Sequence, residues 1–132
     1  VVLRKVAELG IINVNKSASL SKQANTLFNQ QDFLSAAYAF SAAASLDPLE
    51  FSYFENAASA YYLSGLFEES IKYANKVIND LNPGSGKSEY TKALSLQKLG
   101  RTKEACVFFA KSDKHKFKSA KNAIEKYCEN QQ

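Results

Sequence analysis

The residues that most resemble a chemical motif are Gly-Ser-Gly-Lys-Ser at positions 84–88. They are similar to the end of a nucleotide-binding P-loop, but a P-loop also needs a first glycine where Leu81 stands and a buried strand before it. The preceding residues, 68–80, have the pattern of a helix. We therefore interpret residues 84–88 as a turn followed by a helix start, with Ser85 or Ser88 at the start, and expect no nucleotide and no other cofactor.

The other reactive side chains are few and isolated. Cys106 and Cys128 have no histidine or second cysteine at ligand spacing, so we expect neither a zinc site nor a disulfide framework. We interpret Cys106, which lies in an apolar run, as a small buried side chain. His115 lies among lysines with no acidic or cysteine partner suited to catalysis in the local sequence. Without paired carboxylates or a nucleophile beside a base, we expect neither enzyme activity nor a bound metal.

The composition favours a globular helical domain. The chain has 132 residues, 45% of them hydrophobic, with only five glycines and two prolines and a net charge of +4. Position 1 is not methionine, so we interpret the chain as part of a longer protein. No apolar run approaches about 18 residues, so we expect no membrane segment in this part of the protein. As a separate expectation, we assign the chain a cytoplasmic location.

A repeat with a 34-residue period runs through the chain. Residues 21–48 align with residues 55–83, which carry one extra residue near their end, and a third unit follows at 90–112. Small residues recur at two positions of the repeat: Ala24, Ala58 and Ala93, and then Ala36, Ser70 and Ala105. Aromatic residues that would fill the space between helix pairs accompany them: Phe28, Phe40, Phe67 and Phe109. Each unit therefore predicts two amphipathic helices packed closely together.

Helix boundaries are also marked in the repeat. Asp32 and Thr102 precede apolar helical patterns and are predicted N-caps for the second helices of the first and third units. Pro48 and Pro83 follow the second helices of the first two units, and the residue before a proline disfavours helical backbone. We therefore expect those helices to end just before Asp47-Pro48 and Asn82-Pro83.

This pattern resembles the tetratricopeptide repeat (TPR). The resemblance covers about residues 17–112 and is carried by ANTLFNQQDFLSAAYAFSAAASLDP, AASAYYLSGLFEESIKYANKVINDLNP and ALSLQKLGRTKEACVFFAKS. The third unit lacks the closing proline and has Gln97 and Thr102 where the others have aromatics. The resemblance implies an all-α fold, a right-handed α-α superhelix of three helical hairpins with a C-terminal capping helix.

The predicted domain therefore has three hairpins and two different ends. The hairpins are expected at about 17–49, 50–84 and 85–112. Val2, Leu3, Val6 and Leu9 lie at helical spacing before Gly10, so residues 1–16 are predicted to be a partial N-terminal helix, capped by Gly10, and a linker. A capping helix is expected at about 115–128, with these residues on its apolar face: Phe117, Ala120, Ile124 and Tyr127.

The resemblance also implies a binding groove lined by the first helix of each hairpin. Amides suit a peptide backbone, aromatics provide apolar area and lysines attract acidic groups. The predicted groove residues are Asn25, Phe28, Asn29, Asn56, Ser59, Tyr62, Lys87, Tyr90, Thr91 and Lys98. We predict a protein-interaction module, a scaffold or chaperone-like adaptor, that binds a peptide segment of a partner protein.

One alternative is a cochaperone-type domain that binds an acidic C-terminal carboxylate of a chaperone. The resemblance implies a clamp of Lys, Asn, Asn, Lys and Arg for that task. Asn25, Asn56 and Lys87 stand at three of these places, while Ser21 replaces the first lysine and Thr91 the arginine. Because two of the three cations are missing, we favour binding of an internal segment.

An alternative of another class is weak nucleic-acid binding by a C-terminal lysine cluster. Six lysines lie near the end of the chain with Phe117 and Tyr127 between them: Lys111, Lys114, Lys116, Lys118, Lys121 and Lys126. Spacing favours instead a capping helix with a solvated basic face and inward aromatics.

Overall fold

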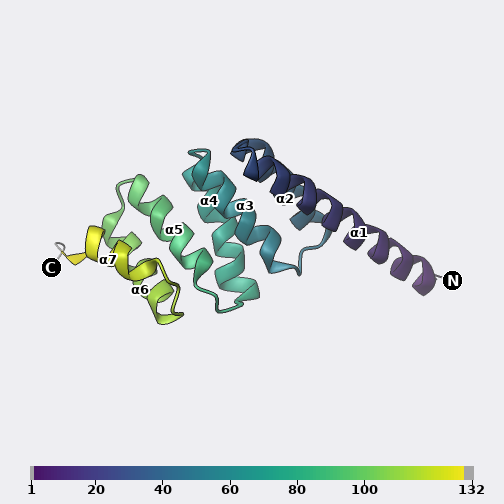
Figure 1. The fold of residues 1–132 in the computed structure, drawn as a ribbon. Helices are drawn as coiled ribbons and strands as arrows, with labels where there is room; N and C mark the ends of the chain where they lie inside the picture. The colour runs from purple at the N-terminus through teal and green to yellow at the C-terminus, as the bar shows by residue number, and fades with distance from the viewer. Residues whose placement is uncertain (1, 130–132) are drawn as a thin grey trace.

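The structure, a computed structural model, describes residues 2–129, and every regular element in that part of the chain is helical. The elements are α1 (Val2–Asn29), α2 (Phe33–Leu46), α3 (Phe51–Leu63), α4 (Phe67–Lys76), the π-helical turn η1 (Val77–Leu81), α5 (Lys87–Lys98), α6 (Thr102–Lys114) and α7 (Ala120–Tyr127). Figure 1 shows the helices stacked side by side, with α7 at one end and the first half of α1 projecting from the other. The predicted fold of three hairpins and a C-terminal capping helix is confirmed.

Small residues hold the two helices of each hairpin together. All six predicted positions have no exposed surface: Ala24, Ala36, Ala58, Ser70, Ala93 and Ala105. The one hydroxyl in this set is satisfied, because Ser70 Oγ donates a hydrogen bond to the carbonyl oxygen of Ala58 at 2.7 Å. Ser95 Oγ in turn donates to Ser70 Oγ at 3.1 Å, so the polar contact links α3, α4 and α5. A larger side chain at any of these positions would separate the helices.

Aromatic side chains occupy the spaces around and between the hairpins. Phe40 and Phe109 are almost entirely buried, as predicted. Phe28 and Phe67 are half-buried and pack at the hairpin ends, with ring centroids 5.1 Å from Phe33 and 5.8 Å from Tyr62. The last hairpin is built around Phe109.

Most helix boundaries follow the sequence signals. The Asp32 side chain accepts a hydrogen bond from the Ser35 N–H at 3.4 Å, which confirms this N-cap. Helix α2 ends at Leu46 and η1 ends at Leu81, each two residues before a proline. The prediction for Thr102 is wrong, because Thr102 is already the first residue of α6, and Arg101 before it makes no side-chain cap.

The predicted N-terminal helix and linker are a single helix instead. Helix α1 runs without interruption from Val2 to Asn29, so Gly10 does not end it and no linker separates it from the first hairpin. A glycine inside a helix costs about 1 kcal/mol, which is less than nucleating a second helix. Large apolar residues on this projecting half are exposed: Leu9, Ile11, Ile12 and Val14. The side chains of Val2, Leu3 and Val6 lie outside the described part.

The capping helix starts later than predicted. Helix α7 begins at Ala120, because Lys116 adopts a left-handed backbone with φ of 62° and turns the chain after α6. The N–H of Phe117 donates to the carbonyl of Ser112 at 3.2 Å and closes this turn. Ala120 and Ala123 are buried, and Ile124 and Tyr127 pack against the same core, as expected of a cap. Phe117, predicted on the apolar face of the capping helix, lies in the turn before it.

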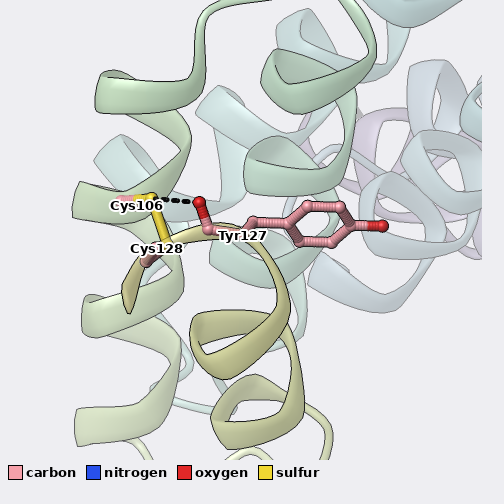
Figure 2. The surroundings of a disulfide bond; sticks show 3 residues. All are labelled: Cys106, Tyr127 and Cys128. Atoms are coloured by element: carbon pink, nitrogen blue, oxygen red, sulfur yellow. Dashed lines mark hydrogen bonds between the residues drawn. A yellow bond between two sulfur atoms is a disulfide. The ribbon is translucent and has the colours of Figure 1, made fainter. Parts of the chain in front are cut away.

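Cys106 and Cys128 form a disulfide, which corrects the expectation that they are unlinked (Figure 2). Cys106 lies in α6, Cys128 follows α7, and their Cα atoms are 5.7 Å apart. The turn after α6 folds α7 back along it, so two cysteines separated by 22 residues meet. Their spacing in the sequence does not predict this contact. The disulfide covalently fixes the end of the capping helix to the last hairpin.

Reduction of this disulfide is expected to lower the free energy of unfolding by about 2 to 4 kcal/mol, the usual effect of opening a loop of this size. The measurement is urea unfolding with and without a thiol reductant. A Cys106→Ser/Cys128→Ser variant is the control, because its stability should match the reduced protein and not respond to the reductant. Two titratable thiols in the denatured but unreduced protein would contradict the disulfide.

Candidate functional site

A groove of about 390 Å³ crosses the first helices of the three hairpins. Its walls come from α1, α3 and α5, with one residue each from α2 and from the turn after α6. Eight of the ten predicted residues line it: Asn25, Phe28, Asn56, Ser59, Tyr62, Lys87, Tyr90 and Thr91. Asn29 and Lys98, at the ends of α1 and α5, are exposed and lie outside its lining. The helical spacing therefore brings most of the predicted site together.

Four lining residues are not among those ten: Phe40, Leu63, Leu94 and Phe117. Phe40 was assigned only to the core, and Leu63 is at the last position of α3. Phe117 was assigned to the capping helix, but its ring centroid lies 5.0 Å from that of Tyr90. No local sequence signal places Phe117 here, because its position depends on the left-handed turn at Lys116.

The polar wall of the groove is organised around Lys87. Its Nζ donates a hydrogen bond to Asn56 Oδ1 at 2.9 Å, so the cation and the amide of neighbouring hairpins are joined. Thr91 Oγ1 donates to the backbone carbonyl of Lys87 at 3.0 Å and is buried. Thr91 is neutral and therefore does not replace the charge of an arginine, and its hydroxyl proton is already used within its own helix.

Buried acidic groups lie behind this wall. Ser85 Oγ donates to Glu55 Oε2 at 2.8 Å, and His115 Nε2 lies 3.2 Å from Glu89 Oε2. Burial raises the pKa of the Glu55 carboxyl above its ordinary value; the hydrogen bond from Ser85 and the charge of Lys87 oppose the increase, and Glu89 adds to it. These contacts connect α3 to the turn before α5, and α5 to the end of α6, and they position Lys87 at the start of α5.

The Gly-Ser-Gly-Lys-Ser stretch is the turn where these elements meet. The preceding elements are α4 and η1, not a strand, so the stretch lacks the setting of a P-loop. Gly86 has φ of 77°, and a Cβ built on it would lie 2.9 Å from the carbonyl oxygen of Ser112 and 3.0 Å from the Phe117 Cβ. Ser112 Oγ donates to the Gly86 carbonyl at 2.8 Å. Glycine is thus required for the close approach of the turn that follows α6.

Features of two other site types are absent from the described residues. No helix within residues 2–129 combines the length and apolarity that crossing a membrane requires. The same residues contain no cluster of three or more histidine, cysteine, aspartate or glutamate side chains arranged to hold a metal ion.

Comparison with known proteins gives matches among solved structures. No protein-family model and no curated protein sequence matches the chain. The TPR domain of Arabidopsis OM64 superposes with a TM-score of 0.82 at 19% identity, over 88% of this chain and 97% of that one. The first TPR domain of Spaghetti (RPAP3), solved with the HSP90 peptide SRMEEVD, gives 0.79 at 21% identity, over 86% and 91%.

A further similar structure is the second TPR domain of human RPAP3, solved with the HSP70 peptide SGPTIEEVD. It gives a TM-score of 0.78 at 18% identity, over 89% of this chain and 97% of that one. Identities this low show the fold and not the partner. The architecture, the repeat and these superpositions agree, and the chain has the fold of a TPR domain.

Proposed function

We propose that this domain is a protein-interaction module, a scaffold or chaperone-like adaptor, that binds an extended peptide segment of a partner protein in the groove. The observation that carries the proposal is the lining of the groove, where aromatic rings, two asparagine amides and one lysine from three hairpins share about 390 Å³. Two domains of the same fold hold peptides of HSP90 and HSP70 in their solved structures, which supports this use of the fold.

The groove offers a peptide two kinds of contact. Asn25 and Asn56 present side-chain amides that can donate to and accept from a peptide backbone. Phe28, Tyr62 and Tyr90 supply apolar surface for side chains of the bound segment. The groove residues offer hydrogen bonds and apolar area, and the proposal assigns them no catalysis.

A second candidate is capture of an acidic C-terminal carboxylate. Asn25, Asn56 and Lys87 do lie in one groove, and both peptides in the similar complexes end in EEVD. Against it, Lys87 is the one cation lining the groove in the described structure, and Thr91 stands where an arginine would complete the clamp. We therefore expect an internal segment to bind better than a free C-terminus.

The test uses random 12-residue peptides displayed in two formats, with a free or with an embedded C-terminus, followed by fluorescence anisotropy on the selected sequences. We expect micromolar binders from the embedded format whose affinity is unchanged by C-terminal amidation. Asn56→Ala should weaken binding about fivefold, the effect of losing one net hydrogen bond. Asn29→Ala removes the same side chain outside the groove and should have no effect.

Two results would change the assignment. Binding of SRMEEVD that is lost on amidation of this peptide would favour the carboxylate-capturing function. Failure of both display formats to yield any binder sensitive to Asn56→Ala would contradict peptide binding in this groove.

A further inference from the structure

We infer that the groove continues past Phe117 onto a basic surface, and that the partner segment is acidic where it leaves the groove at this end. The inference rests on the proposed function and specifies the kind of partner. The basic surface is defined by Lys116, Lys118 and Lys121, which together with Phe117 and Asp113 line a second depression of about 450 Å³.

Phe117 joins the two surfaces. Its side chain lines both the groove and the second depression, and in the groove it packs against Tyr90. Tyr90 in turn belongs to α5, the same helix that carries Lys87. A peptide that runs along the groove past Tyr90 reaches Phe117, and Phe117 also lines the depression that carries the lysines.

The charge of the basic surface is not balanced within the domain. Lys116, Lys118 and Lys121 are exposed and make no salt bridge with any group in residues 2–129. Asp113 is the one acidic residue lining the depression in that part of the chain. The neighbouring imidazole of His115 lies 3.2 Å from the Glu89 carboxyl in α5, with Nε2 toward Oε2. Three lysines against one aspartate leave an excess of positive charge at the mouth of the groove, which complements an acidic segment.

An acidic peptide fits this surface better than a nucleic acid does. Nonspecific binding of single strands combines lysines with aromatic rings on which bases stack. Here Phe117 lines the basic surface but already packs against Tyr90, and the Tyr127 ring, which is not part of that lining, stacks on Phe109 with ring centroids 5.9 Å apart. The surface thus offers three lysines but a single aromatic ring that is already packed on one side, next to a groove whose lining suits a peptide.

The experiment extends one groove-binding peptide from the display selection by three glutamates, or by three glutamines, at either end. Anisotropy titrations use the full chain at low and at high salt. We expect the glutamate extension to strengthen binding about fivefold over glutamine, at one end only, the scale of one to a few exposed ion pairs. The gain should disappear at high salt.

The variant Lys118→Gln/Lys121→Gln should abolish the gain and leave the unextended peptide's affinity unchanged. The matched control, Lys16→Gln/Lys103→Gln, removes the same charge at exposed positions of α1 and α6 that line neither surface and should retain the gain. Equal binding of both extensions, with normal binding of the unextended peptide, would overturn this inference alone. If neither the extended nor the unextended peptide binds, both this inference and the proposed function are contradicted.

A nucleic acid is tested in parallel with a 12-nucleotide oligothymidylate. We expect it to bind more weakly than the glutamate-extended peptide at physiological salt. Tighter binding of the oligonucleotide than of that peptide, lost in Lys118→Gln/Lys121→Gln, would overturn the inference in favour of nucleic acid.

Discussion

Replacement of Phe109 with alanine is expected to lower the free energy of unfolding by about 3 to 5 kcal/mol, the usual cost of removing a fully buried phenylalanine. Phe109 has no exposed surface, and its ring contacts Tyr90 and Tyr127 at centroid distances of 5.8 Å and 5.9 Å. The variant loses the contact between the last hairpin and its cap, and it leaves a cavity. Urea unfolding followed by circular dichroism measures the change.

The control for this variant is Val107→Ala in the same helix. Val107 is 52% exposed, so its truncation should change stability by no more than about 0.5 kcal/mol. Because Tyr90 lines the groove, Phe109→Ala should also weaken peptide binding, whereas Val107→Ala should not. A Phe109→Ala protein as stable as the parent would show that α7 does not pack on the last hairpin as described.

The substitution Gly86→Ala is expected to cost about 2 to 5 kcal/mol. A left-handed backbone conformation costs an alanine about 1 to 2 kcal/mol. The added methyl group must also displace the Ser112 carbonyl, 2.9 Å away, or separate the turn after α6 from α5, which adds about 1 to 3 kcal/mol. Thermal and urea unfolding measure the loss.

Gly65→Ala separates the two contributions. Gly65 has φ of 82°, close to that of Gly86, but a Cβ built there meets nothing within 4 Å. Gly65→Ala should therefore lower the free energy of unfolding only by the conformational cost of about 1 to 2 kcal/mol. If Gly65→Ala and Gly86→Ala are equally destabilising, the close packing at Gly86 contributes nothing, and the docking of the 112–117 turn is not tight.

The parts of the fold that could be predicted are those governed by a local rule repeated along the chain. Ala24, Ala58 and Ala93 recur because close packing of two helices requires a small residue at the same point of each hairpin. The groove residues follow from the same register, since residues on one face of a helix recur every three or four positions. Asn29 and Lys98 fit that spacing but lie at helix ends, beyond the groove.

The parts that could not be predicted depend on contacts across the fold. Phe117 reaches the groove because Lys116 adopts a left-handed backbone conformation. Lysine rarely adopts this conformation, so its presence in the sequence does not predict the turn. The pairing of Cys106 with Cys128 depends on the path of the turn before α7. Gly10 resembles a helix end, but the cost of a glycine inside a helix is small, and α1 continues through it.

The disulfide bears on the cytoplasmic location that we proposed from the sequence. Disulfides persist in oxidising compartments and are rare in the cytosol, where thiols are kept reduced. A cytoplasmic domain would therefore contain Cys106 and Cys128 as thiols and lack the covalent link between α6 and α7. The compartment of the protein and the oxidation state of Cys106 and Cys128 are best determined in the same experiment.

The stacking of each helix mainly on its neighbours along the chain has a kinetic consequence. Contacts between segments close in sequence require little loop closure, so a protein of this kind is expected to fold within milliseconds or faster. Folding can begin in any hairpin and spread to the next, as in other linear arrays. A destabilised hairpin at either end would then open while the remainder stays folded, so the domain need not unfold in a single step.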